Sequence, residues 1–283
     1  MFEIPEVQSI KPLAATSDVW FLDIWGVMHN GRKPFDTAVA ACVTFRRSGG
    51  TVVLVSNSPR PRAGVIRQLS DIGVDANAYD AVVTSGDVSR DLIATWSGRG
   101  VRHIGPSRDV PIFDGLNVRC VGVDEADGIV CTGLYNDDVE TPDDYRDELA
   151  ALRARDLDMI CANPDIKVER GGRIIFCAGA IAAAYEAMGG RVLYAGKPHA
   201  PIYELACQAV TQLRGSAVER ARILAIGDGV HTDIEGAAKF GIRSVFVASG
   251  VHVEAHETLA DAARRHFVAP HGRPVAVMRA LAW

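Results

Sequence analysis

An aspartate at the end of an apolar run is the clearest candidate for chemistry in this chain. Asp23 follows the run Val19–Leu22, and Gly26 comes shortly after it. A carboxylate is costly to bury, and open α/β sheets bind ligands at the carboxyl ends of their strands. The simpler alternative is that Asp23 caps the next helix. Three later segments with similar polar endings favour a functional role.

Two of these segments offer groups that suit an anion. Ser56-Asn57 ends an apolar run, and its hydroxyl and backbone N–H groups could hold an anionic oxygen. Lys197, in the segment GKP, follows another apolar run, and its ammonium could pair with a carboxylate or a phosphate. Taken singly, the first is an ordinary loop start and the second an ordinary surface lysine.

The third segment carries two carboxylates close together. Asp228 and Asp233 lie in ILAIGDGVHTDIEGA, which begins as an apolar strand. Hard oxygen ligands of this kind suit Mg²⁺, which binds through one or two carboxylates and keeps several waters. The plain alternative is a loop aspartate followed by an aspartate at a helix N-terminus.

Regular elements must bring these four segments together. Apolar runs alternate with helical patterns, which predicts an α/β fold with a Rossmann-like parallel sheet covered by helices on both faces. The middle of the chain is less regular, so we expect a core domain at 1–86 and 194–283 and an inserted α/β cap domain at 87–193. The expected strands include 19–23, 51–55, 81–83, 118–123, 223–226 and 244–247, and the expected helices include 35–47, 63–72 and 202–213.

The bulk composition excludes several classes of protein. A net charge of -5 without a basic stripe argues against nucleic acid as a partner. No run approaches the roughly 20 apolar residues of a membrane span, so no membrane partner is expected. The N-terminus is acidic where a signal peptide would be basic. The six cysteines form no CxxC motif, which indicates reduced thiols and a cytoplasmic location.

The order of the four segments resembles the haloacid dehalogenase superfamily. Along the chain, a strand ends at an aspartate (Asp23), a second ends at a serine (Ser56), a lysine follows (Lys197), and a loop then carries two aspartates (Asp228 and Asp233). The resemblance covers about residues 17–249. The chain is similar to the branch with a large α/β cap, which includes p-nitrophenyl phosphatase and pyridoxal-phosphate phosphatase. TSGD (84–87), ANPD (162–165) and GKP (196–198) support this resemblance.

The resemblance implies a role for each motif residue. Asp23 would be a nucleophile that forms an aspartyl-phosphate, assisted by Lys197 and Ser56. The phosphorylated substrate would contact Ser56, Asn57, Lys197 and Asp165. The implied cofactor is Mg²⁺, held by Asp23, the backbone carbonyl of Trp25, Asp228 and Asp233.

The chain departs from this pattern at Trp25. Phosphatases of the superfamily typically carry a second aspartate there, which protonates the leaving oxygen, and such help is worth about 10² to 10⁴ in rate. An indole does not exchange a proton near neutral pH. Three compensations stay open: acyl or aryl leaving groups that need no proton, His29 as the acid, or an acid such as Asp165 or Asp87.

The expected function is therefore a Mg²⁺-dependent hydrolase acting on a small phosphorylated metabolite. The alternative is a catalytically weak or silent relative that binds a phosphorylated ligand, and a third reading is a metal-independent dehalogenase. The cap would close over the site, with ANPD and the loop at 170–172 selecting the substrate. The resemblance also implies a homodimer. His199 and His231 are interpreted as loop residues, and His252 and His256 as part of a surface helix.

Overall fold

Two compact units make up the chain. The computed structural model describes residues 4–170, 173–248, 257–268 and 272–283. The first unit comprises Met1–Ser56, Ile66–Val83 and Lys197–Trp283, and the second comprises Asn57–Val65 and Thr84–Gly196. Among the helices in the described ranges, none has the length and apolar character that crossing a bilayer requires.

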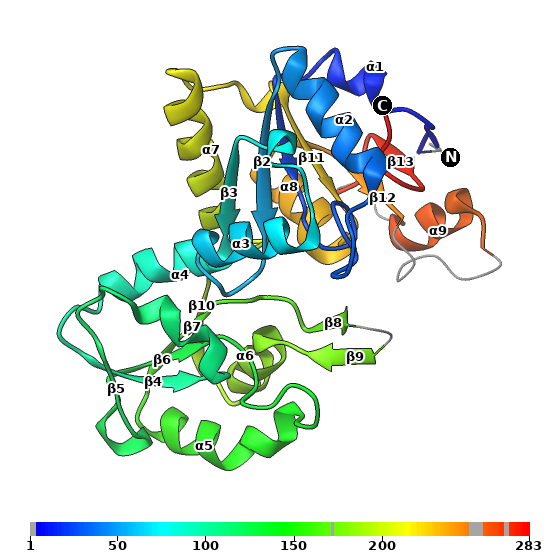
Figure 1. Cartoon of the computed structure of the whole chain (residues 1–283). Helices are drawn as coiled ribbons and strands as arrows, with labels where there is room; N and C mark the ends of the chain where they lie inside the picture. Colours follow the sequence, from blue (N-terminus) through cyan, green and yellow to red (C-terminus); the bar gives the residue numbers. More distant parts are fainter. Residues whose placement is uncertain (1–3, 171–172, 249–256, 269–271) are drawn as a thin grey trace. The chain divides into compact units, whose positions relative to one another are not determined.

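A six-stranded sheet forms the centre of the first unit (Figure 1). In spatial order its strands are β13 (Ala276–Met278), β12 (Arg243–Val247), β11 (Ile223–Gly227), β1 (Val19–Leu22), β2 (Thr51–Ser56) and β3 (Ala81–Thr84). Strand β1 pairs in parallel with β2 and β11, β11 with β12, and β12 with β13. The strands β1, β2 and β11 are almost continuous buried runs, as expected for parallel strands covered on both faces.

Helices cover both faces of this sheet. They are α1 (Lys11–Ala14), α2 (Asp36–Arg47), α3 (Arg62–Ile72), α7 (Ala200–Arg214), α8 (Glu235–Phe240) and α9 (Leu259–His266). Successive side chains of a strand point to opposite faces. Trp20 stacks on Phe45 of α2 with ring centroids 4.0 Å apart, whereas Phe21 contacts Tyr203 of α7. Helices α2 and α7 therefore pack on opposite faces of β1.

A five-stranded parallel sheet forms the centre of the second unit. In spatial order its strands are β10 (Arg191–Tyr194), β7 (Asp158–Cys161), β6 (Gly128–Cys131), β4 (Gly100–Ile104) and β5 (Arg119–Cys120). The unit also holds the antiparallel pair β8 (Lys167–Arg170) and β9 (Arg173–Phe176), and the helices α4 (Ser85–Ala94), α5 (Arg146–Ala154) and α6 (Ala178–Ala187).

Side chains of β6 show that this second sheet is also covered on both faces. Ile129 and Cys131 pack with Leu149 of α5 and Ile181 of α6. Val130, between them in the chain, packs with Ile93 of α4. Each unit thus has its own apolar layers on either side of a parallel sheet, as in α/β proteins generally.

The predicted α/β class is confirmed, and strands 19–23, 51–55 and 223–226 correspond to β1, β2 and β11 with ends that differ by one residue. The strand expected at 118–123 is only the two-residue β5, and β8, β13 and α9 were not expected. The division into core and cap domains stays a prediction. In the structure, 57–65, 84–86 and 194–196 cluster with the second unit.

Local contacts explain these differences in the boundaries. Strand β10 pairs with β7, so the second unit extends past residue 193. Arg60 forms an ion pair with Asp109 at 3.7 Å, and Arg62 forms one with Asp87 at 3.3 Å. These ion pairs connect the segment 57–65 to Asp87 and Asp109, and the segment therefore belongs to the second unit.

Candidate functional site

Asp23, Ser56 and Asp228 lie at the carboxyl ends of three neighbouring strands in the first unit. The register aligns the last residue of β1 with Leu54 of β2 and with Ile226 of β11. The backbone N–H of Asp23 donates to the carbonyl of Ile226 at 2.8 Å, which continues the alignment beyond β1. The strand-end pattern of the sequence thus places all three residues at one edge of the sheet.

Lys197 joins two carboxylates at this edge. Its ammonium donates to Asp23 Oδ1 at 2.5 Å and to Asp233 Oδ1 at 2.7 Å. The residue is only 3% exposed. Burial alone would lower the pKa of Lys197, but the charges and hydrogen bonds of the two carboxylates raise it above its ordinary value. Lys197 therefore carries its positive charge at neutral pH.

Asp233 is held at both of its oxygens. It lies in a single π-helical turn, η6 (Val230–Ile234), just after β11. Its Oδ2 accepts the backbone N–H of Gly229 at 3.0 Å, while Oδ1 accepts from Lys197. Because both oxygens have partners, the carboxylate has a fixed orientation.

Three carboxylates at the edge fit a hard divalent cation. Asp23, Asp228 and Asp233 each offer an oxygen, and these atoms lie within 4.8 Å of one another. Burial raises the pKa of Asp23 well above its ordinary value; Lys197 opposes this, whereas the charges of Asp233 and Asp228 add to it. All three donors are hard carboxylate oxygens, so the residues present suit a hard divalent cation.

Trp25 presents a partly exposed aromatic ring two residues after Asp23. The residue is 38% exposed. Gly31 has a φ of +82°, and a Cβ at this position would lie 2.5 Å from the indole Cη2. The ring of His29 meets the indole edge to face, with centroids 5.5 Å apart. The loop is therefore built around the indole, which needs a glycine at position 31.

His29 does not match the general acid considered from the sequence. It is almost completely buried, and its Nδ1 accepts the N–H of Gly31 at 2.9 Å, which assigns the ring proton to Nε2. Burial lowers the pKa of His29 from 6.5 to about 4. The imidazole is neutral at pH 7 and supports the loop that carries Trp25.

Asp165 and Asp87, the two acids of the second unit that the sequence singles out, have structural partners. Asn57 Nδ2 donates to Asp165 Oδ1 at 2.9 Å. Asp87 closes a capping box at the start of α4: its Oδ2 accepts from the N–H and hydroxyl of Thr84, and its Oδ1 accepts the N–H of Arg62. Asp87 thus serves as a helix cap, and a substrate contact for Asp165 stays a prediction.

Other residues singled out from the sequence are placed as follows. Arg170 pairs with Asp137 and Asp138, each at 2.9 Å, and residues 171–172 lie outside the described part of the chain. His231 is exposed on η6 and lies 3.5 Å from Glu235. His252 and His256 also lie outside the described residues.

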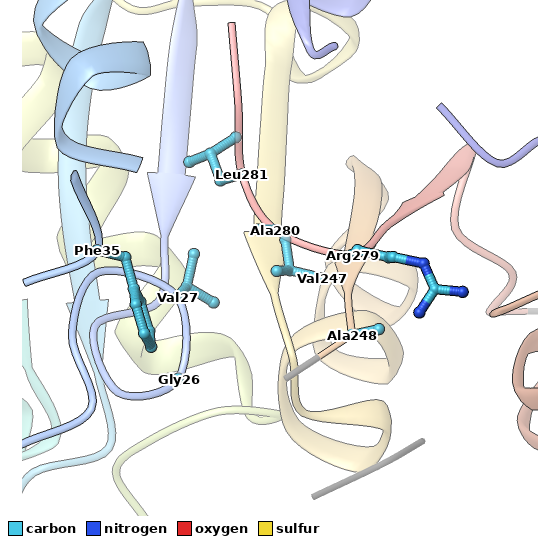
Figure 2. A pocket seen from close by; sticks show the side chains of 8 residues that line it. All are labelled: Gly26, Val27, Phe35, Val247, Ala248, Arg279, Ala280 and Leu281. Carbon is cyan, nitrogen blue, oxygen red and sulfur yellow. The ribbon is translucent and has the colours of Figure 1, made fainter. Parts of the chain in front are cut away.

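A pocket of about 230 Å³ lies in the first unit beside Gly26 and Val27 (Figure 2). Its walls are mainly apolar and include Phe35 and Leu281. Figure 2 shows the guanidinium of Arg279 directed away from these apolar side chains. Among its described lining residues there is no acid, histidine or nucleophile, so the pocket walls supply no group that could carry out catalysis.

Sequence reasoning missed two features of the site. It assigned Lys197 to Asp23 but not to Asp233, although the spacing of Asp228 and Asp233 placed a second acid nearby. It also did not identify Gly31, because no pattern in the sequence shows that an indole lies against it.

Comparisons with known proteins agree with this geometry. Residues 20–119 match the family model of haloacid dehalogenase-like hydrolases, and residues 194–273 match a HAD-hydrolase-like model. The structure of a haloacid dehalogenase-like hydrolase from Brucella suis 1330 is 49% identical, covers 98% of this chain and 100% of that chain, and has a TM-score of 0.88.

A curated relative is the D-glycerol 3-phosphate phosphatase of Mycobacterium tuberculosis. It is 28% identical over 266 residues, which are 90% of this chain and 70% of the relative. A crystal structure of the glycerol phosphate phosphatase of that organism, in complex with calcium, is 25% identical with a TM-score of 0.70 and covers 94% of this chain and 74% of that chain.

The two family models span the segments that contribute Asp23, Ser56, Lys197 and Asp228 to the edge of the sheet. Nearly half of all positions are shared with the Brucella protein along the full length of both chains. The chain therefore belongs to the haloacid dehalogenase-like family of hydrolases.

Proposed function

We propose that the protein is a Mg²⁺-dependent phosphatase that hydrolyses a small phosphorylated metabolite through Asp23. The observation that carries this proposal is the buried contact of Lys197 with Asp23 and Asp233, with Asp228 beside them. The mycobacterial relative is a phosphatase of a small phosphate ester, and the glycerol phosphate phosphatase structure from the same organism is a complex with calcium. Both support phosphoryl chemistry with a divalent cation.

The residues of the site would act in two steps. A carboxylate oxygen of Asp23 attacks phosphorus, and the bond to the leaving oxygen breaks with its electron pair on that oxygen. Water then attacks phosphorus, and the bond between phosphorus and the Asp23 oxygen breaks with its electron pair on the carboxylate. The proton that water loses passes to solvent, phosphate leaves, and Asp23 is restored. The ammonium of Lys197 stabilises the charge between Asp23 and the phosphoryl group, whose oxygens bind the hydroxyl of Ser56 and the backbone N–H of Asn57.

The three clustered carboxylates support one position for the cation. Asp23, Asp228, Asp233 and the backbone carbonyl of Trp25 would hold it. When bound, Mg²⁺ supplies positive charge that offsets the negative charge of the phosphoryl oxygens. The buried carboxylate of Asp23 would then stay ionised in spite of its raised pKa.

Trp25 favours substrates whose leaving oxygen needs no proton. The indole has no titratable group near neutral pH, and His29 beside it is neutral. Aryl and acyl phosphates have such leaving groups, whereas alkyl phosphates do not.

The same residue supports a second candidate function. A chain that lacks a proton donor at position 25 could bind a phosphorylated ligand without turning it over. Mg²⁺ with beryllium fluoride, which mimics an aspartyl-phosphate, tests the role of Asp23. We expect it to raise the melting temperature of the wild type but not of Asp23→Asn. An equal rise in both proteins would contradict a nucleophilic Asp23. The cytoplasmic location and the homodimer stay predictions.

A further inference from the structure

A small cluster in the second unit holds the residues that flank Ser56 and Lys197 in the chain. Asn57 directly follows Ser56, and Gly196 directly precedes Lys197. Both lie in the second unit, where they contact each other and Asp165 or its neighbour Pro164. The two proposed phosphoryl-binding residues are therefore each one peptide bond away from the same set of contacts.

Asp165 fixes the orientation of the Asn57 amide. The Asn57 atom that lies 2.9 Å from Asp165 Oδ1 is the amide nitrogen, which donates a hydrogen bond to that oxygen. The amide oxygen then faces Gly196, where a Cβ would lie 2.5 Å from it. Asn57 is 5% exposed, and its amide is constrained at both ends by these two contacts.

The segment around Asp165 is itself fixed. The backbone N–H of Asp165 donates to Asn163 Oδ1 at 3.0 Å, and its carbonyl accepts the N–H of Gly179 at 3.2 Å. Gly179 belongs to the first turn of α6, which packs on the sheet of the second unit. Because its backbone is held by Asn163 and by the first turn of α6, Asp165 holds the side chain of Asn57 in a fixed position relative to that helix.

Gly196 is required at its position by the same packing. A Cβ there would lie 2.8 Å from Pro164 Cδ and 2.9 Å from Ser85 Oγ, in addition to the close approach to Asn57. These neighbours come from the Asp165 loop and from the start of α4. Any side chain at position 196 would have to displace Asn57 or the loop.

From these contacts we infer that Asp165 and Gly196 are positioning residues for phosphate binding. Asp165 acts through Asn57, whose backbone lies beside Ser56, and Gly196 keeps the space that this arrangement needs. The inference rests on the proposed function of Ser56, Asn57 and Lys197. The alternative role for Asp165 is a direct contact with the leaving group of the substrate. In that case the effect of replacing Asp165 would depend on the leaving group, whereas a positioning role predicts the same effect for every substrate.

Inorganic phosphate separates the two roles, because it has no leaving group. Its dissociation constant is measured by calorimetry with Mg²⁺ for the wild type, Asp165→Ala, Asp165→Asn and Gly196→Ala. The exposed Asp143 of the same unit provides a matched control, Asp143→Asn. Circular dichroism establishes that each variant is folded, and kcat/KM is measured with p-nitrophenyl phosphate and acetyl phosphate.

We expect Asp165→Ala to weaken phosphate binding roughly 10-fold, the factor that corresponds to one lost hydrogen bond. Gly196→Ala should also weaken it, because the added Cβ displaces Asn57. Both should lower kcat/KM by the same factor for the two substrates. Asp165→Asn should bind phosphate more tightly than Asp165→Ala, because its amide oxygen still accepts from Asn57. Asp143→Asn should match the wild type.

Unchanged phosphate binding in Asp165→Ala, with unequal losses on the two substrates, would overturn the inference and establish a leaving-group contact. Equal phosphate affinity in all folded variants would also overturn it. If the proposed phosphatase function is wrong, the wild type will show no turnover of either substrate. The comparison of phosphate affinities by calorimetry would still test the positioning role in that case.

Discussion

Replacing Lys197 by methionine tests the charge arrangement of the site. The ammonium contacts Asp23 and Asp233, and the residue is almost fully buried. Methionine has a similar length but no charge. The variant would leave three clustered carboxylates without their buried cation.

The expected cost follows from the distances. With an effective dielectric constant of about 20, an ion pair at the observed 2.5 or 2.7 Å gains about 6 to 7 kcal/mol before desolvation. Taking the ions out of water offsets most of this gain, and removing one partner of a buried ion pair typically costs about 3 to 5 kcal/mol. We therefore expect Lys197→Met to lower the free energy of unfolding by about 3 to 5 kcal/mol at pH 8 without Mg²⁺.

The loss should depend on pH and on the cation. The pKa of Asp23 is already raised in the folded protein, and the variant lacks the lysine charge that opposes this. A raised folded pKa means that protonation of Asp23 relieves the repulsion as pH falls, so the loss should be smaller at pH 5.5 than at pH 8. Mg²⁺ should stabilise the variant, because it replaces part of the missing charge.

Urea unfolding at the two pH values, with Mg²⁺ or with a chelator, measures these effects. Lys239→Met is the matched control, since Lys239 is 58% exposed and pairs with Glu235 on one helix. This control should change the free energy of unfolding by less than about 0.5 kcal/mol. An exposed ion pair is worth less than about 1 kcal/mol. If Lys197→Met lost less than this, and lost the same amount at both pH values, the buried charge cluster would be refuted.

Three further predictions concern the first unit. The pKa of His29 is about 4 when folded and 6.5 when not, so the unfolded chain takes up the proton first and stability falls as pH drops from 6.5 to 5. In urea unfolding, His29→Asn should reduce that slope by up to about 1.4 kcal/mol per pH unit, and an unchanged slope would contradict the burial argument. Trp20 is fully buried and stacked on Phe45, so Trp20→Ala should cost about 3 to 5 kcal/mol in the same assay, and a cost below about 1 kcal/mol would contradict this packing. Trp25→Asp should raise kcat/KM for an alkyl phosphate more than for p-nitrophenyl phosphate, by up to about 100-fold, and equal changes would remove the argument from the missing proton donor.

The strand-end residues could be predicted because local pattern and sheet geometry agree. Asp23, Ser56 and Asp228 each follow or end an apolar run, and parallel strands place such ends at one edge. These residues come together when the first residues of the neighbouring strands pair with one another, as Val19 does with Thr51 and Ile223. A sequence pattern is sufficient evidence for this arrangement.

Contacts between distant segments could not be predicted in the same way. The bond of Lys197 to Asp233 depends on the π-helical turn after β11, which no periodicity indicates. The contact between Asn57 and Asp165 joins residues far apart in the chain, and it places a segment expected in the core with the second unit. The fit of Gly31 under Trp25 is likewise visible only when both are placed.

Asp87 illustrates how packing decides the role of an acid. Asp87 was considered as a proton donor, but its carboxylate closes the capping box of α4. Its spacing from Thr84, three residues, is the usual signature of such a box. The sequence therefore also supports the structural role of Asp87, as the cap of α4.

Phosphate release from p-nitrophenyl phosphate and acetyl phosphate is the most direct test of the proposed phosphatase activity. It is measured for the wild type and Asp23→Asn, each with Mg²⁺ and with a chelator. We predict that the wild type releases phosphate only with Mg²⁺ and that Asp23→Asn releases none under either condition. No release by folded, Mg²⁺-bound wild type from either substrate, or equal release by Asp23→Asn, would contradict a phosphatase that acts through Asp23.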